Sequence, residues 1–428
     1  MRHNMRSITL LIIFSLAALC GYAQEIPEIR VQLATENRLA PVQLLPFTTS
    51  DNSVSAAYLK QLDGILRFDV SYSGYMVPVS AEMRAAYTVS GTVKGKKLTL
   101  TALQGAGNRQ IKEILLSGSL SIDRRQVHKA TDALLKHWFN AQGIAASKLL
   151  FAIQSQQNNT WVSEIWESDW DGGNLTQVTQ EKSYCVSPAF IPSKPGHESR
   201  RFVYVSYKLG QPKIYLASLD EGKGRRVVDL RGNQLLPAVS PQRNKIAFIC
   251  DAAGRTDLFI QSINPESGEM GKPVQLFSYP RSTQASPTFN PSGSQIAFVS
   301  DKDGSPRIYV IPTAVTKQRA DATLITKKNS ESSCPAWSPD GTKLAYSAKT
   351  KGVRQIWIYD FNAGEERQLT DGPGNKENPC WASDSLHLVF NSTDASSSEI
   401  FLVNLNQPDA VKITSGGGKK HYPTWSQL

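Results

Sequence analysis

The chain has 428 residues and a formal net charge of +10, with 47 Lys and Arg residues against 37 Asp and Glu residues. A basic balance can indicate nucleic-acid binding, but the basic residues form no dense run, so charge alone does not favour that class of partner. Beyond the first 23 residues, no segment is apolar enough over a sufficient length to span a bilayer.

Residues 1–23 predict a secretory signal peptide. Two arginines precede a short apolar run over residues 8–19, and Ala23 ends a small-residue motif that a signal peptidase can cleave. Cys20 leaves a lipoprotein as an alternative, although the leucine directly before it is poorly suited to lipidation. We expect a mature chain that begins at Gln24, is exported and soluble, and carries a charge of +8 because the two arginines are removed.

Residues 24–146 predict a small α/β domain with mixed strands. Its first part, residues 24–39, is an extended segment in which apolar and polar residues alternate, so that one face is apolar. Asp123 is the expected N-cap of the last helix, whose stripe includes Val127 and Leu134. The expected elements are strand 41–47, helix 58–66, strands 87–93, 98–103 and 114–120, and helix 123–140.

A proline-anchored phrase recurs six times in residues 147–428, at spacings of 49, 50, 48, 44 and 44 residues. Each full repeat contains four short strand-like runs, and the outermost run is the most polar. A period of this length with four graded strands is typical of a β-propeller. The six anchors are Pro188, Pro237, Pro287, Pro335, Pro379 and Pro423.

The last repeat is cut off after its first strand, at residues 423–428. Three strand-like runs without a partner phrase lie near residues 149–153, 164–167 and 176–179. The two ends together make one repeat, so we expect a six-bladed propeller that the C-terminal strand closes without an exposed sheet edge. A linear solenoid is the alternative, and it would need capping repeats.

The four cysteines of the mature chain are candidates for disulfides, since export permits them. Three full pairings are possible and the spacing does not choose between them. Four small, unpaired side chains are the favoured interpretation. These residues are Cys185, Cys250, Cys334 and Cys380.

Catalytic motifs are absent from the sequence. A serine hydrolase would need a G-x-S-x-G nucleophile elbow, which does not occur. The inner-strand phrases contain no Asp or Glu that could hold a metal at the channel, as propeller lactonases require. His128 and His137 share a helix but are nine residues apart, which is not the spacing of a ligand pair. We expect no enzyme, no cofactor and no metal.

The loops that lead from an outer strand to the next inner strand emerge on one face of the ring, and each contains a basic residue. Such a collar would concentrate the electric field at the channel mouth and favour an acidic partner. The alternative is that a basic protein carries lysines everywhere. The collar consists of Lys182, Arg231, Arg281, Lys327, Lys328, Lys376, Lys419 and Lys420.

The order of these parts, together with the stretch 334–346 (CPAWSPDGTKLAY) and the terminal YPTWS at 422–426, resembles the TolB family of the Tol–Pal system. The resemblance covers the whole mature chain. It implies a non-catalytic periplasmic scaffold, expected as a monomer without nucleic-acid partners, that supports outer-membrane integrity, envelope constriction in cell division and protein import.

The resemblance also implies two partners. A TolA-like inner-membrane protein would bind the segment after signal cleavage, here residues 24–39, and a Pal-like peptidoglycan-associated lipoprotein would bind the propeller mouth. Coupling between the two sites is expected. The TolA-like site would comprise Ile26, Ile29, Arg30, Val31, Gln32, Leu33 and Arg38. The Pal-like site would comprise the collar together with Asn233, Gln234, Gln284, Ala285 and His421.

Two other classes remain open from the sequence. One is a propeller enzyme, a hydrolase or lactonase, with an unusual channel site. The other is a carbohydrate-binding propeller, because the eight tryptophans could stack on sugars. Trp337, Trp381 and Trp425 repeat at one blade position, however, and are therefore expected in the core.

Overall fold

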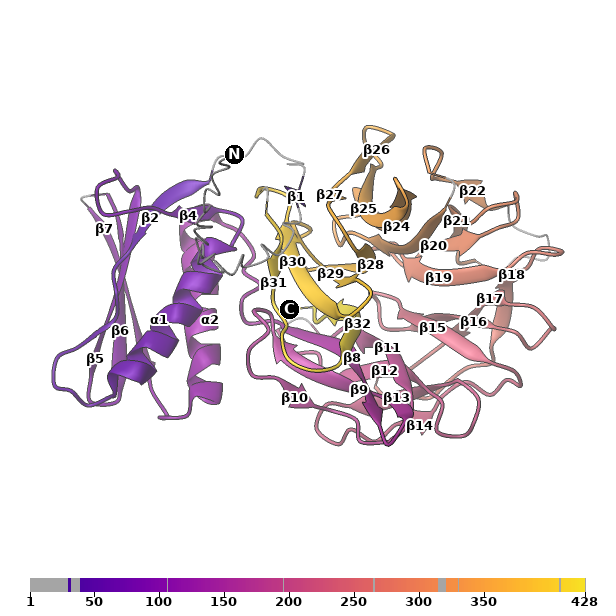
Figure 1. The fold of residues 1–428 in the computed structure, drawn as a ribbon, viewed down its shortest axis with the longest axis horizontal. Helices are drawn as coiled ribbons and strands as arrows, with labels where there is room; N and C mark the ends of the chain where they lie inside the picture. Colours follow the sequence, from indigo (N-terminus) through magenta and orange to yellow (C-terminus); the bar gives the residue numbers. More distant parts are fainter. Residues whose placement is uncertain are drawn as a thin grey trace, which may run out of the picture.

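The computed structural model describes residues 30–31 and 39–427, apart from residues 106, 195, 265, 315–320, 330 and 408. The expected signal peptide and most of the TolA-like segment lie outside the described residues. Figure 1 shows two units side by side, a small α/β unit and a β-propeller. Among the described residues, no helix is long and apolar enough to cross a membrane.

The α/β unit is a mixed sheet with two helices on one face, and the helices lie between the sheet and the propeller (Figure 1). β2 runs parallel to β4 and β5, whereas β5, β6 and β7 form an antiparallel meander. The elements are β2 (Ala40–Leu44), β3 (Thr48–Thr49), α1 (Ala56–Ser71), β4 (Met76–Pro78), β5 (Tyr87–Lys94), β6 (Lys97–Gln104), β7 (Asn108–Leu115) and α2 (Leu120–Phe139).

The two helices pack through apolar stripes into one buried cluster with the sheet. Ser55 caps α1, since its side chain accepts a hydrogen bond from the backbone N–H of Tyr58. α2 begins at residue 120 after Ser119, so the expectation of Asp123 as the N-cap was wrong. The Asp123 carboxylate still accepts from the N–H groups of Ser117 and Gly118 directly before the helix.

The propeller consists of six four-stranded sheets, which confirms the predicted number of blades. From the inner to the outer strand, blade 1 consists of β32 (Lys419–Trp425), β8 (Lys148–Gln157), β9 (Thr160–Asp169) and β10 (Thr176–Gln177), and blade 2 consists of β11 (Cys185–Ile191), β12 (Arg201–Ser206), β13 (Lys213–Ser218) and β14 (Arg225–Arg226). In the same order, blade 3 consists of β15 (Gln234–Val239), β16 (Lys245–Cys250), β17 (Asp257–Ser262) and β18 (Val274–Phe277), and blade 4 consists of β19 (Gln284–Phe289), β20 (Gln295–Ser300), β21 (Arg307–Pro312) and β22 (Thr323–Leu324). Blade 5 consists of β23 (Ser332–Trp337), β24 (Lys343–Thr350), β25 (Val353–Asp360) and β26 (Glu365–Gln368), and blade 6 consists of β28 (Asn375–Trp381), β29 (His387–Thr393), β30 (Ser398–Asn404) and β31 (Val411–Lys412).

Blade 1 joins the two ends of the propeller, as predicted. β32 pairs antiparallel with β8, with Trp425 opposite Leu149 and Lys419 opposite Gln154. Trp425 is 2% exposed, and its indole N–H donates to the Ser147 hydroxyl at 2.5 Å. The ring is therefore closed by backbone pairing and by a buried aromatic side chain.

Every inner strand carries the same irregularity just before its proline. The register shifts there, and the residue before the proline has a positive φ of 46–55°. The six residues and their prolines surround a narrow waist of about 130 Å³ in the central channel. The residues with positive φ are Ser187, Leu236, Ser286, Cys334, Asn378 and Tyr422.

The antiparallel order gives the ring two distinct faces. We call the mouth face the one that carries the loops from an outer to the next inner strand and the hairpins between second and third strands. The opposite face carries the other two sets of hairpins. The cysteines lie within the blades, and all four are free.

Candidate functional site

Four of the six mouth-face loops expose basic side chains of the predicted collar. In the described part of the chain, no ion pair involves Lys182, Arg231, Arg281 or Lys327. Lys182, Arg231, Arg281, Lys327 and Lys328 are all exposed. The arc that they form runs over the loops between blades 1 and 2, 2 and 3, 3 and 4, and 4 and 5.

The other two loops differ, because Lys376 and Lys420 are buried with 0% and 1% exposure. The expectation that both contribute surface charge was wrong. The Lys376 ammonium donates to the carbonyl oxygens of Gly372 at 2.7 Å and Gly374 at 3.1 Å. Lys420 pairs with Glu399 at 3.1 Å. Only the half-buried Lys419 remains at the surface there, so the collar is interrupted around blade 6.

The amide side chains predicted at the mouth bind the protein itself. Gln234 and Gln284 are buried, and the Gln234 amide donates to the carbonyl oxygen of Leu230 at 2.8 Å. The Asn233 amide donates to Asp251 at 2.8 Å. These hydrogen bonds stabilise the conformation of the mouth-face loops.

Two further predicted residues, Ala285 and His421, are half-buried on the inner strands. Burial lowers the pKa of His421, and the positive charge of Lys419 lowers it further. This imidazole is therefore neutral at neutral pH and adds no charge to the collar.

An apolar rim on blades 1 and 2 was missed by the sequence reasoning. Trp161 is 48% exposed and Leu209 69% exposed, both in hairpins of the mouth face. Tyr184 and Tyr207 of the neighbouring segments are half-buried, and their rings lie edge to face with centroids 5.6 Å apart. Backbone hydrogen bonds join these segments, from Ser163 N to Ser183 O at 2.9 Å and from Tyr207 N to Tyr184 O at 3.2 Å.

We name Trp161, Tyr184, Tyr207 and Leu209 the aromatic rim. Lys182, the first residue of the basic arc, lies two residues before Tyr184 in the same loop. Large exposed apolar side chains next to unpaired cations are typical of protein-binding surfaces. The only sequence signal was the placement of these residues in otherwise polar hairpins.

The N-terminal segment also reaches the mouth face. β1 (Arg30–Val31) pairs antiparallel with β27 (Thr370–Asp371), and Arg30 lies opposite Asp371. β27 belongs to the loop between blades 5 and 6, where Lys376 is buried, and Figure 1 shows the two short strands side by side. The remaining residues of the TolA-like site, Ile26, Ile29, Gln32, Leu33 and Arg38, lie outside the described residues.

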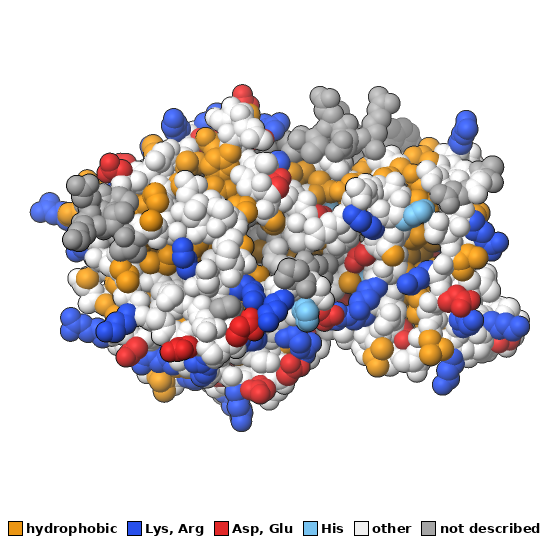
Figure 2. All heavy atoms as spheres, turned by 180° about the vertical axis from the view of Figure 1, so that it is seen from behind, with side chains coloured by type: hydrophobic (Ala, Val, Ile, Leu, Met, Phe, Trp, Pro, Cys, Tyr) orange, Lys and Arg blue, Asp and Glu red, His pale blue; other side chains and the backbone are white. Residues whose placement is uncertain are grey.

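Basic and acidic side chains are interspersed on the side of the molecule that Figure 2 shows. They form no single patch on that side. A general excess of lysine and arginine therefore explains part of the positive charge of the surface. The basic arc differs from this general excess because its members occur in successive loops of one face, and not because its charges are dense.

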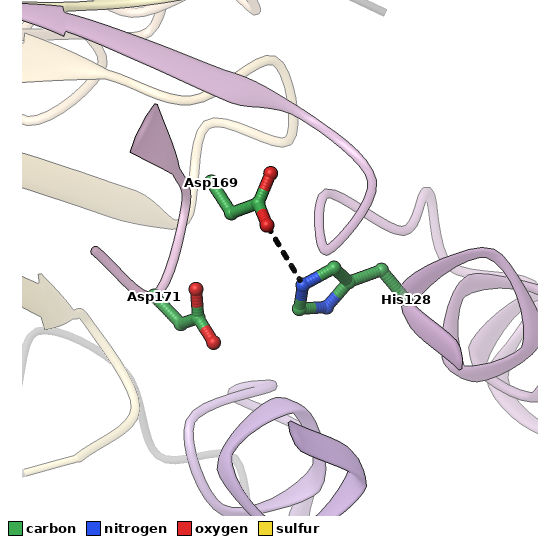
Figure 3. Close-up of side chains that lie close together, drawn as sticks. All are labelled: His128, Asp169 and Asp171. Carbon is green, nitrogen blue, oxygen red and sulfur yellow. Dashed lines mark ion pairs between the residues drawn. The ribbon is translucent and has the colours of Figure 1, made fainter. Parts of the chain in front are cut away.

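A buried ionic cluster joins the α/β unit to blade 1 (Figure 3). The ring of His128 contacts Asp69 at 2.8 Å through Nδ1 and Asp169 at 3.8 Å through Nε2. Arg124 pairs with Asp169 at 2.9 Å and with Asp171 at 2.5 Å. These contacts cross from α2 to the end of β9, so they fix the α/β unit against the propeller.

The pKa values of this cluster follow from its charges. Burial alone would lower the pKa of His128, but the carboxylates of Asp69 and Asp169 raise it to about 10. Burial opposes ionisation of Asp169 too, yet the nearby positive charges of His128, Lys148 and Arg124 lower its pKa. The imidazole is therefore protonated at neutral pH.

The ligand atoms of His128, Asp169 and Asp171 lie within 4.8 Å of one another, a spacing that a metal ion could use. Lys148 also approaches Asp169, at 2.6 Å. Arg124 and Lys148 thus already supply the positive charge that these carboxylates need, and a divalent cation would have to displace them. The donor set fits an ionic contact between the two units better than a metal centre.

Known proteins resemble this chain over most of its length. The family described as "PD40: TolB beta propeller domain" matches residues 137–323 and 313–427. A TolB homolog of Protochlamydia amoebophila is 46% identical over 405 residues, covering 87% of this chain and 86% of that protein. A TolB homolog of Chlamydia pneumoniae is 37% identical over 379 residues, covering 87% and 86%.

A solved structure shows the same fold. The crystal structure of TolB from Acinetobacter baumannii superposes with a TM-score of 0.73 and covers 94% of this chain and 100% of that chain. Its sequence identity is 18%, so it supports the architecture and not individual site residues.

Proposed function

Because this chain belongs to the TolB family of β-propeller proteins, we propose that it is a non-catalytic periplasmic scaffold of a Tol–Pal system. In this proposal, residues 1–23 are removed on export and residues 24–428 are the mature protein. The observation that carries the proposal is the mouth face, which carries an unpaired basic arc, an aromatic rim on blades 1 and 2 and the N-terminal strand on the loop between blades 5 and 6.

A Pal-like lipoprotein domain would dock on the mouth face. The arc would attract an acidic surface over a distance of about a Debye length and accelerate encounter. The aromatic rim would supply most of the affinity, since aromatic anchors dominate protein interfaces. Lys182 of the arc lies in the same loop as Tyr184 of the rim, so the proposed interface would be centred near blades 1 and 2.

A TolA-like protein would bind residues 24–39. A free extended segment with one apolar face can add as a strand to the edge of a partner's sheet. In the structure the backbone of Arg30 and Val31 instead pairs with β27. The two described residue pairs form a short stretch of strand pairing, which a longer pairing with the edge of a partner's sheet would replace.

The proposed coupling between the two sites runs through the loop between blades 5 and 6. β27 ends at Asp371, and the next residue, Gly372, is held by the buried ammonium of Lys376 at 2.7 Å. A partner that binds this loop would shift β27 and change the strength of its pairing with the N-terminal segment. Coupling requires that each partner changes the affinity for the other by the same factor.

Calorimetric titration with the Pal-like domain from the same source tests the docking site. The double variant Arg231→Glu and Arg281→Glu is expected to bind about tenfold more weakly at low salt, and the difference should shrink as salt rises. Lys223→Glu is the matched control, because Lys223 is exposed on the opposite face. Equal effects of the double variant and the control would refute docking on the basic arc.

A further inference from the structure

A crevice opens on the opposite face between blades 4 and 5. Its volume is about 390 Å³, within the range of about 300–1,000 Å³ that small-molecule sites occupy. Blade 4 supplies one wall and blade 5 the other. The side chains that matter are Asn290, Gln295, Val310, Thr323, Trp337 and Phe361.

Trp337 differs from the aromatic residues at the same place in other blades. Those residues are only 2–6% exposed, whereas Trp337 is half-buried. Its ring stacks on that of Phe361, with centroids 4.9 Å apart and planes 7° apart. Both residues line the crevice. The four buried equivalents are Phe190, Phe289, Trp381 and Trp425.

Polar groups stand opposite these rings. Gln295 and Thr323 are exposed, and no hydrogen bond is found for Gln295 Nε2 or Thr323 Oγ1 within the described ranges. The Asn290 carbonyl oxygen is used internally, since it accepts from the N–H groups of Ser294 and Gln295. The crevice therefore offers a free amide donor and a free hydroxyl.

Among the described residues that line the crevice, no side chain is ionisable as an acid or a base. An ionic ligand would lose its hydration there without gaining a counter-charge. The ligand that fits should be uncharged, with one flat apolar face and hydrogen-bonding groups around its edge.

We propose that this crevice binds a neutral saccharide. The C–H groups on one face of a sugar ring carry partial positive charge and match the negative face of an indole. Its equatorial hydroxyl groups would reach Gln295 and Thr323. This site is independent of the mouth face and of the partners proposed there.

The crevice adjoins a cavity of the central channel. Trp337 and Pro291 line both the crevice and a larger cavity of about 570 Å³ that opens on the opposite face. The walls of that cavity are mostly proline, alanine and aromatic residues. A saccharide of more than one unit could therefore seat one ring on Trp337 and extend a second toward the channel.

Titration of the mature chain with a trisaccharide of N-acetylglucosamine and with maltotriose, at millimolar concentration, tests this proposal by calorimetry and tryptophan fluorescence. Trp337→Leu is expected to weaken binding at least about tenfold. Thr323→Val removes only an exposed hydroxyl and is expected to weaken it about three- to tenfold. Thr176→Val is the matched control, because Thr176 is an exposed threonine on the outer strand of blade 1.

Binding of either trisaccharide that both crevice variants weaken and the control leaves unchanged would support the proposal. Thermal unfolding of each variant shows whether it is folded. If Trp337→Leu does not fold, Thr323→Val still tests the proposal. Failure of both sugars to bind the unmodified protein would overturn the proposal. Binding that ignores both crevice variants would overturn it as well.

Discussion

Closure of the ring by β32 makes Trp425 the side chain whose loss should matter most at the chain end. Trp425 is 2% exposed and packs with Leu149, Phe151 and Ala382 in one cluster. Truncating a buried tryptophan to alanine costs about 3–5 kcal/mol, and the lost bond to Ser147 adds about 1 kcal/mol. Trp425→Ala should therefore lower the free energy of unfolding by about 4–6 kcal/mol, from a typical total of about 5–15 kcal/mol.

Urea unfolding followed by near-ultraviolet circular dichroism measures this loss. The matched control is Trp161→Ala, because Trp161 is 48% exposed at a hairpin, and a surface change of this kind costs about 0.5 kcal/mol or less. A loss below about 1 kcal/mol for Trp425→Ala, or equal losses for the two variants, would refute the view that the C-terminal strand holds the ring together.

Three further predictions concern other parts of the molecule. The pKa of His128 is raised to about 10, so its contribution to stability is complete below about pH 6.5 and is lost as pH rises through about 10. His128→Gln should remove that part of the pH dependence of the free energy of unfolding. A pH profile that the substitution leaves unchanged would contradict the ionic cluster. Gly172→Ala would place a Cβ 1.7 Å from the Ile413 carbonyl oxygen, whereas Gly210 has nearly the same positive φ and open space around it. Gly210→Ala should therefore cost only the backbone strain of about 1–2 kcal/mol. In thermal melts, Gly172→Ala should lose clearly more stability than Gly210→Ala. Deletion of residues 24–38 should accelerate hydrogen exchange at the β27 amide that points toward β1, which is one of the neighbouring Thr370 and Asp371 N–H groups because such groups alternate in direction along a strand. Protection of both amides that the deletion leaves unchanged would show that β1 does not hold β27.

The sequence was sufficient to predict the ring of six blades, because each blade is encoded by a short local motif that repeats along the chain. The phrase around Pro423 matches five earlier copies, and its missing strands could be found near residue 149 from the same pattern. The structure pairs Trp425 with Leu149, so a short motif identified a contact between the two ends of the domain. Family membership followed from the same repeats.

Burial of individual loop cations could not be predicted in this way. Lys376 lies three residues before its anchor Pro379, whereas Lys182 lies six residues before Pro188. The Lys376 ammonium is surrounded by the carbonyl oxygens of its own loop. That difference depends on the path of three glycine and proline residues, which a pattern of charges does not contain.

Side-chain contacts between segments that share no repeat could not be predicted from the sequence either. His128 meets Asp69 and Asp169, which lie 59 residues before it and 41 residues after it. The spacing of His128 and His137 on one helix contains no information about these partners. The aromatic rim was missed for a related reason, since the exposure of Trp161 and Leu209 is set by how neighbouring hairpins pack.

The measurement that tests the proposed scaffold role most directly is a hydrogen-exchange footprint of the Pal-like domain on the mature chain. Docking on the mouth face predicts slower exchange in the hairpins at residues 157–160 and 207–212 and in the loops that carry Lys182 and Arg231. Protection confined to the opposite face, or no protection at saturating partner, would contradict it.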